Sequence, residues 1–213
     1  MFVKIPPDLL RIIATDSERM PRLYYHPLAV ARSFFWSRLK HIHGLMNKHL
    51  RNRDSCLDFA CGSGVFLPTL SSLFRSVRGI DIELVEAPKI VEQYSLSNVR
   101  LTSADIYTAG LDERFDAIVA ADVLEHFEQL DKAVLQLKHW LKDDGLLFTS
   151  LPTENVFTRF TRVLGGYTKP ADHYRSGEEV EEILRSQGFR KIESRTILFF
   201  FPLYLIGVWE KTV

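Results

Sequence analysis

Short apolar runs alternate with amphipathic segments through the middle of the chain. The runs have the length and composition of buried strands, whereas the segments between them repeat apolar residues at helical spacing. The strands predicted in this way are 56–60, 76–80, 99–103, 115–121 and 146–151, and the helices between them are 65–74, 84–94 and 130–141. Strands that alternate with helices are typical of a parallel sheet with helices on both faces.

The C-terminal part of the chain predicts a capped helix and a strand pair. Ser176 and Glu179 have the spacing of a capping box, so a helix is expected to start there and to end near Gly188. Two further strands, 191–200 and 203–211, follow the helix. Before the helix, residues 157–169 are expected to form an insertion with a short helix of its own.

The N-terminal part predicts a short helix over 7–14 and a longer one over 28–50. The apolar face of the longer helix consists of Phe35, Leu39, Ile42 and Met46. From Arg19 to Arg53 the sequence has eight Lys or Arg residues and four His, but no acidic residue. Two interpretations stay open. The helix packs on the domain with its basic residues (Arg32, Arg38, Lys40, His43 and Lys48) in solvent, or it offers them to an anionic membrane or a negatively charged substrate.

Composition limits the class of protein more than its partners. A chain of 213 residues fits one α/β domain, and its 27 basic and 27 acidic residues cancel, which predicts no polyanionic partner. The two cysteines have no further ligand at metal-binding spacing, which favours a reducing, cytoplasmic location. We expect neither a signal peptide nor a membrane-spanning segment; peripheral contact with a membrane stays open.

Acidic residues stand at the carboxyl ends of four predicted strands. They are Asp58, Asp81, Asp105 and Asp122. Because right-handed crossovers bring these strand ends to one edge of the sheet, we expect the four residues around one crevice. Gly62 and Gly64 follow the first strand, and a strand, glycine turn and helix in succession lets backbone approach a nucleotide-like ligand. A nicotinamide dinucleotide is not favoured, because its fingerprint needs Gly or Ala where this chain has Leu67.

Five segments together resemble the class I S-adenosylmethionine-dependent methyltransferases, particularly the ubiquinone-pathway and type 11 enzymes. They are residues 57–64, 79–82, 103–106, 115–126 and 141–147, in the family's order and at about its spacing. The resemblance covers about residues 55–189. It implies a Rossmann-like α/β three-layer sandwich whose seven-stranded, mostly parallel sheet ends in an antiparallel strand pair. We expect one domain over residues 1–213, with 1–50 as a helical lid and 153–175 as an insertion over the acceptor site.

The resemblance also implies which residues bind S-adenosylmethionine, whose product after methyl transfer is S-adenosylhomocysteine. Asp58 and the loop from Ala60 through Gly62 to Gly64 would lie beside the methionine portion. Asp81 would accept hydrogen bonds from the two ribose hydroxyls, and the next residue, Ile82, is also expected to contact the cofactor. Asp105 and the Ile106 backbone would read the adenine, and Ala121 and Asp122 would line the sulfonium side. The family usually has glycine at the position of Ala60, and alanine fits there if its φ is negative.

Candidate catalytic groups are fewer. His126 and His173 are candidate bases. In a helix, Asp122, Glu125 and His126 would share one face, and the similar ubiquinone-pathway O-methyltransferases hold a divalent metal with such a set. We favour no metal here and assign Glu125 and His126 to the geometry of the cofactor loop. Asp116 is expected to cap or pair rather than bind.

The acceptor is expected to be an apolar or amphiphilic small molecule that is methylated on oxygen, carbon or nitrogen. Residues 172–175 would close over it, and the opposite wall would come from the aromatic residues Tyr24, Tyr25, Phe34 and Trp36. The alternative is a non-catalytic S-adenosylmethionine-binding module that acts through its basic N-terminal helix. Nucleic acid is not favoured, because the chain has no base-flipping motif.

Overall fold

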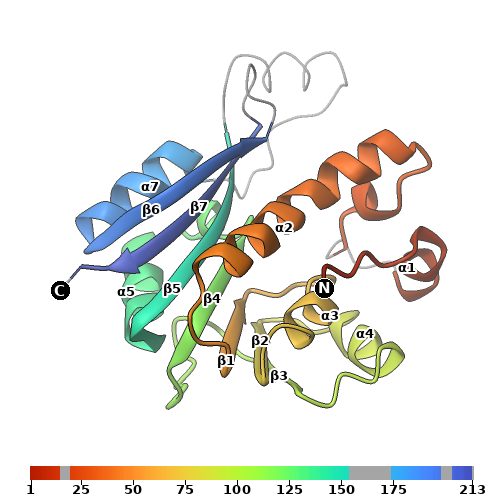
Figure 1. The fold of residues 1–213 in the computed structure, drawn as a ribbon, viewed down its shortest axis with the longest axis horizontal. Helices are drawn as coiled ribbons and strands as arrows, with labels where there is room; N and C mark the ends of the chain where they lie inside the picture. The colour runs from red at the N-terminus through yellow and green to blue at the C-terminus, as the bar shows by residue number, and fades with distance from the viewer. Residues whose placement is uncertain (15–19, 154–173, 198–202, 213) are drawn as a thin grey trace.

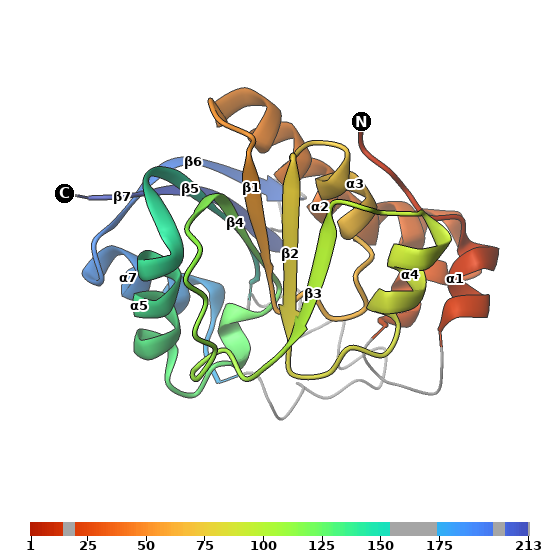
Figure 2. The ribbon, with the colours of Figure 1, turned by 90° about the horizontal axis from the view of Figure 1, so that it is seen from below.

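One seven-stranded sheet, in the order β3-β2-β1-β4-β5-β7-β6, forms the centre of the molecule (Figures 1 and 2). The computed structural model describes residues 1–14, 20–153, 174–197 and 203–212 of the 213-residue chain. The strands are β1 (Ser55–Phe59), β2 (Ser76–Asp81), β3 (Val99–Ser103), β4 (Phe115–Ala121), β5 (Leu141–Pro152), β6 (Phe189–Ile197) and β7 (Tyr204–Lys211). β1 to β5 pair in parallel, and β7 runs antiparallel to both β5 and β6, which confirms the predicted fold class.

Helices cover both faces of the sheet, as Figure 2 shows. The described helices are α1 (Pro7–Ile13), η1 (Arg22–Tyr25), α2 (Ala29–His49), α3 (Leu67–Ser71), α4 (Ala87–Gln93), η2 (Leu124–His126), α5 (Leu130–Trp140) and α7 (Gly177–Ser186). One hydrophobic core joins α1 to α4 to one face, and a second joins α5 and α7 to the other. Burial on both faces explains why the parallel strands read as continuous apolar runs.

Helix ends differ from the sequence prediction where proline intervenes. The predicted helix 65–74 is shortened to α3, and 84–94 is shortened to α4. Pro68 and Pro88 each stand in the first turn, because a proline further inside would remove a backbone hydrogen bond and clash with the preceding turn. The predicted cap of α7 is confirmed: Ser176 accepts from the backbone of Glu179, and the Glu179 side chain accepts from the backbone of Ser176 at 2.7 Å.

The N-terminal elements belong to the first core. Residues preceding α1 are tied to α3, since the Val3 backbone N–H donates to Thr69 Oγ1 at 3.0 Å. Helix α2 lies along one face of the sheet (Figure 1). It buries Phe35, Leu39, Ile42 and Met46, as its periodicity predicted. In the described part of the chain, no helix is both long and apolar enough to cross a membrane.

The expected insertion helix 157–169 lies outside the described residues, as does His173.

Candidate functional site

A pocket of about 580 Å³ opens at the carboxyl ends of β1, β2, β3 and β4. This is where the strand order reverses between β1 and β4, the usual ligand position in open α/β sheets. Its walls are formed by Ala60, Gly62, Asp81, Ile82, Asp105, Ile106, Tyr107, Asp122, Val123, His126, Phe127, Glu128 and Tyr174. The volume lies in the range of sites that bind molecules of drug or cofactor size.

Most of the candidate binding residues converge on this pocket. Ala60, Gly62, Asp81, Ile82, Asp105, Ile106, Asp122 and His126 all line it. Asp58, Gly64 and Ala121 do not. A Cβ on Gly64 would lie 2.8 Å from Leu67 Cδ1 and 2.9 Å from Ala87 Cβ, so this glycine permits close packing between the loop and the helices α3 and α4.

The loop after β1 is held against the end of β2. The Gly62 N–H donates to Asp81 Oδ2 at 2.8 Å, and the Cys61 N–H donates to the Ile80 carbonyl at 3.0 Å. Asp81 is 4% exposed, and its Oδ1 also accepts from the Glu83 N–H at 3.2 Å. Asp81 lines the pocket, and a carboxylate offers about four acceptor positions to hydroxyl or N–H donors.

Ala60 has a backbone conformation that the sequence analysis did not expect. Its φ is +55°, in the left-handed region, rather than negative. An L-residue pays roughly 1–2 kcal/mol for this conformation, and glycine does not. The structure therefore gives a physical reason for the glycine that the resembling family usually has here. Ala60 lines the pocket in spite of that strain.

Asp58 is a buried carboxyl group on β1. Burial, and secondarily the charge of Asp81, raises its pKa to about 7 from an ordinary value of 3.8. It is 5% exposed and lies behind the pocket wall rather than in it.

Aromatic residues that the sequence analysis missed form one side of the pocket. The Asp105 carboxylate accepts from the Tyr107 N–H at 2.9 Å, which turns the chain so that Tyr107 lines the cavity. The Tyr107 ring meets Phe127 edge-on at 5.5 Å between centroids, and Phe127 lies 5.6 Å from Phe59. Both pocket aromatics stand in loops close behind a predicted site residue (Ile106 and His126), a sequence signal that could have identified them.

Asp122, Glu125 and His126 do not lie in one helix, which was the condition for them to share a face. Asp122 has φ +55° and precedes the short turn η2, so the three residues do not follow one helical repeat. Glu125 is 1% exposed, and its Oε1 lies 4.0 Å from His126 Nε2. Among the described residues, no group of three or more His, Cys, Asp or Glu is arranged to hold a metal ion.

Arg38 corrects the interpretation of α2 as a helix whose basic residues face solvent. It is 3% exposed and forms an ion pair with Asp122 at the end of β4. Its Nη2 donates to the Tyr24 hydroxyl at 2.9 Å and its Nε to the Phe35 carbonyl at 2.9 Å. The sequence did carry the signal, because Arg38 lies three residues after Phe35 and four before Ile42, on the buried stripe.

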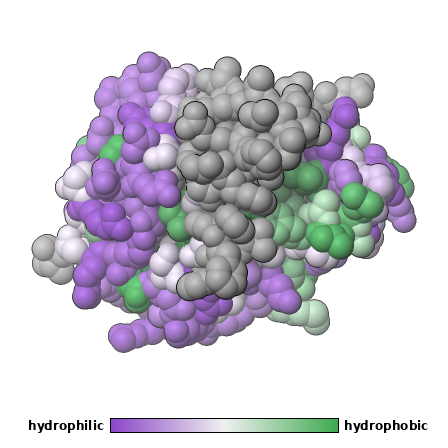
Figure 3. Space-filling model, turned by 90° about the horizontal axis from the view of Figure 1, so that it is seen from above, coloured by the Kyte–Doolittle hydropathy of each residue, from purple (hydrophilic) through white to green (hydrophobic). Residues whose placement is uncertain are grey.

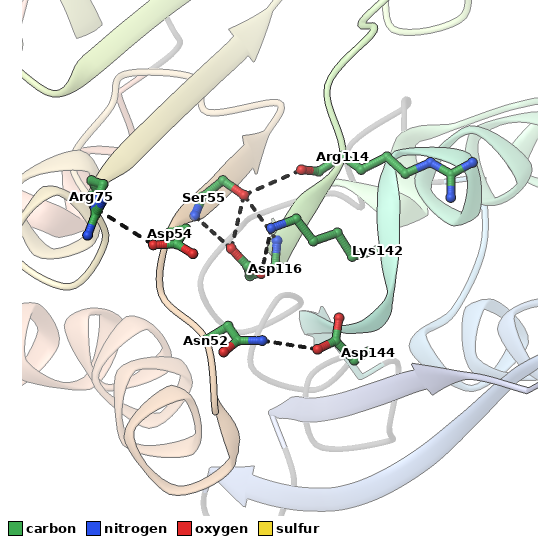
Figure 4. Close-up of polar contacts among 8 residues, drawn as sticks. All are labelled: Asn52, Asp54, Ser55, Arg75, Arg114, Asp116, Lys142 and Asp144. Atoms are coloured by element: carbon green, nitrogen blue, oxygen red, sulfur yellow. Dashed lines mark hydrogen bonds and ion pairs between the residues drawn. The ribbon is translucent and has the colours of Figure 1, made fainter.

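Asp116 has the structural role that was predicted for it. It lies at the amino end of β4, where Figure 4 shows its carboxylate between Ser55 and Lys142. Oδ2 accepts from the Ser55 N–H, and Oδ1 accepts from Lys142 Nζ, both at 2.8 Å. Burial alone would raise the pKa of Asp116, but these hydrogen bonds outweigh burial and lower it. Nearby, Asn52 donates to Asp144 at 3.0 Å.

Known proteins with similar sequences are methyltransferases. (S)-Coclaurine N-methyltransferase of Papaver somniferum is 32% identical over 104 residues, which cover 46% of this chain and 30% of that protein. The mitochondrial ubiquinone biosynthesis O-methyltransferase of Candida albicans is 27% identical over 155 residues, 65% of this chain and 47% of that protein. The chain thus spans less than half of the length of these relatives.

Solved structures show the same fold. The N-methyltransferase NodS of Bradyrhizobium japonicum, in complex with S-adenosyl-L-homocysteine, has a TM-score of 0.70 at 20% identity, over 96% of each chain. Magnesium protoporphyrin IX methyltransferase of Synechocystis, also with that product bound, has a TM-score of 0.70 at 17% identity, over 96% of this chain and 94% of that one. The family model described as methyltransferase domain matches residues 32–194, most of the 213-residue chain. The chain therefore belongs to the methyltransferase domain family, among the class I S-adenosylmethionine-dependent methyltransferases.

Proposed function

We propose that the protein transfers a methyl group from S-adenosylmethionine to a small-molecule acceptor. The observation that carries this proposal is the convergence of the Gly62 loop, Asp81 and Asp105 on one pocket of about 580 Å³. Backbone, carboxylates and an aromatic wall in that arrangement fit a nucleoside-containing cofactor. The cofactor supplies an activated methyl group, so the chain's main task is to orient the two reactants.

In this proposal the two acidic strand ends have separate tasks. Asp81, fixed by the backbone of Gly62 and Glu83, accepts hydrogen bonds from the ribose hydroxyls. Asp105 accepts from the adenine amino group, and Tyr107 and Phe127 pack against the ring. The backbone N–H groups of Gly62 and Glu83 thus help to fix the position of the Asp81 carboxylate.

His126 is the proposed base on the acceptor side. Its side chain is 33% exposed, lines the pocket and lies 4.0 Å from the buried Glu125 carboxylate. From this position His126 can take the proton that the acceptor releases as it is methylated. His173, the other candidate, stays a sequence-based proposal.

Calorimetry with S-adenosylhomocysteine tests the cofactor assignment. Asp81→Ala should weaken binding at least tenfold because the ribose loses its acceptor, while Asp54→Ala, at an exposed carboxylate away from the pocket, should leave affinity unchanged. If the unaltered protein binds neither S-adenosylmethionine nor S-adenosylhomocysteine, the proposal is refuted. Binding without product formation from any acceptor would instead support the non-catalytic module acting through its N-terminal helix.

A panel of apolar amines and phenols, with release of S-adenosylhomocysteine as the readout, tests the acceptor class. Both N- and O-methyltransferases occur among the relatives, so the panel covers nitrogen and oxygen acceptors. His126→Asn should lower turnover roughly 100-fold or more without lowering the affinity for S-adenosylhomocysteine. Unchanged turnover in this variant would remove His126 from the reaction.

We further propose that the N-terminal elements touch an anionic membrane from which an amphiphilic acceptor is drawn. Ile12, Leu28 and Val30 are 80%, 67% and 83% exposed. Figure 3 shows hydrophobic residues gathered on the side of the molecule where α1, η1 and the start of α2 lie. Arg22 and Lys40 are exposed on the same elements, in the stretch that has no acidic residue. Exposed apolar side chains together with exposed basic ones on the N-terminal elements match an anionic lipid surface.

Co-sedimentation with vesicles of anionic and of neutral phospholipid tests this contact. The protein should bind the anionic vesicles more tightly, and Leu28→Glu should weaken that binding several-fold by adding a charge and removing apolar surface. The control is Leu135→Glu, because Leu135 is 52% exposed on α5, in the layer on the other face of the sheet. If Leu28→Glu and Leu135→Glu lose vesicle binding equally, the N-terminal elements are not a defined membrane-binding surface.

A further inference from the structure

Arg38 and Asp122 form a charge pair in which only the acid reaches the pocket. Helix α2 brings Arg38 across the face of the sheet to the carboxyl end of β4, where the residue is 3% exposed. The Asp122 side chain is 21% exposed and lines the pocket. A ligand in the pocket therefore meets the carboxylate directly and the arginine charge from behind it.

The pair has little freedom to rearrange. Besides Asp122, the guanidinium donates to the Tyr24 hydroxyl and to the Phe35 carbonyl. The Phe35 ring covers it at 3.6 Å, and Tyr204 lies 5.1 Å away. On the other side, Ser150 Oγ donates to Asp122 Oδ1 at 2.5 Å. Elements from both ends of the chain thus fix the distance between the two charges.

We propose that Arg38 is a positioning residue that neutralises Asp122 toward the pocket and thereby sets the relative affinity for S-adenosylmethionine and S-adenosylhomocysteine. This inference rests on the proposed function and on the expectation, implied by the family resemblance, that Asp122 lines the sulfonium side of the cofactor. The two molecules differ there by one methyl group and one positive charge. An unpaired carboxylate would attract the sulfonium of S-adenosylmethionine and not the thioether of S-adenosylhomocysteine. A carboxylate paired with an arginine attracts the sulfonium much less, so the affinities for the two molecules then differ less.

Neutralisation also affects the reaction. Methyl transfer removes the positive charge from the sulfur, so attraction between an unpaired Asp122 and the sulfonium would be lost on the way to the transition state. Attraction that is stronger in the ground state than in the transition state raises the barrier. Arg38 weakens that attraction without itself touching either reactant.

Calorimetric titration with both cofactor forms separates this role from a structural one. Arg38→Met keeps an apolar chain against the Phe35 and Tyr204 rings and removes the charge, so affinity for S-adenosylmethionine relative to S-adenosylhomocysteine should rise roughly tenfold. Asp122→Asn leaves Arg38 unpaired and should move the ratio in the opposite direction. Arg38→Lys, which keeps the charge, should change the ratio less than threefold, and the double variant Arg38→Met/Asp122→Asn should return it toward that of the unaltered protein.

The outcomes are distinguishable. If Arg38→Met binds S-adenosylhomocysteine and the ratio is unchanged, or both ligands weaken equally, Arg38 only holds α2 in place and the inference is overturned. If Arg38→Met does not fold, the opposite shift expected for Asp122→Asn decides in the same way, and no shift in that variant overturns the inference. Failure of the unaltered protein to bind either cofactor form refutes the proposed function itself.

Discussion

The buried carboxyl group of Asp58 should make the protein less stable as the pH rises toward neutrality. In the native state, burial and the charge of Asp81 raise its pKa to about 7, whereas an exposed aspartate in the unfolded chain titrates near 3.8. Between these two values the native state binds more protons than the unfolded state. The free energy of unfolding therefore falls across this interval, and the full cost is present above pH 7.

The size of the effect follows from the shift. About three pK units at about 1.4 kcal/mol each give roughly 4 kcal/mol as an upper value. Asparagine has a similar shape and carries no charge, so Asp58→Asn should remove this pH dependence. We expect Asp58→Asn to be more stable than the unaltered protein at pH 8, by up to about 4 kcal/mol, and the difference to shrink as the pH approaches 4.

Urea denaturation at several pH values between 4.5 and 8 measures this difference. Other groups also titrate, so the quantity of interest is the gap between the two proteins, not either curve alone. Asp54→Asn, at a carboxylate exposed on the surface, is the control and should follow the unaltered protein. Parallel curves for Asp58→Asn and the unaltered protein would show that Asp58 stays ionised in the native state and would refute the reasoning.

Three further substitutions test features of the fold. Ala60→Gly should raise the free energy of unfolding by about 0.5–1 kcal/mol, because relief of the φ +55° conformation exceeds the entropy cost of glycine. If urea denaturation instead shows a lower free energy of unfolding for this variant, the conformation is not strained. Asp116→Ala should cost about 2–3 kcal/mol, since it leaves the Ser55 N–H and Lys142 without their acceptor, yet S-adenosylhomocysteine affinity should not change. Weaker binding of S-adenosylhomocysteine by Asp116→Ala would show that contacts at the amino ends of the strands affect the pocket at their carboxyl ends. Ser176→Ala should cost about 1 kcal/mol through loss of the cap of α7, while replacement of the exposed Ser186 near the end of the same helix should cost less.

The sequence predicted the sheet well because buried parallel strands leave a strong local signal. Each predicted strand is present, although β5 starts earlier, directly after α5. The acidic strand ends Asp81, Asp105 and Asp122 also met as expected, since their convergence follows from topology alone.

The failures have two physical causes: contacts between residues distant in sequence, and weak local signals that other features of the sequence obscured. The backbone of Asp122 lies in the left-handed region where its carboxylate meets Arg38 and Ser150, a combination that no local pattern encodes. Both interpretations of the basic N-terminal helix placed Arg38 on the surface because of its charge, although its position on the apolar stripe indicated burial. Tyr107 and Phe127 lie in loops without periodicity, where the only sequence signal was their closeness to Ile106 and His126.

The order of the strands has a consequence for the kinetics of folding. β6 and β7 are neighbours in sequence, but β1 and β4 pair across β2, β3 and α4, and the pocket walls come from the loops after β1, β2, β3 and β4. The site is therefore complete only after this long-range pairing has closed, which is a slow step. A ligand that needs the complete site therefore binds the native state and not the states that precede the pairing of β1 with β4. Bound S-adenosylhomocysteine should accordingly slow unfolding and leave the refolding rate unchanged.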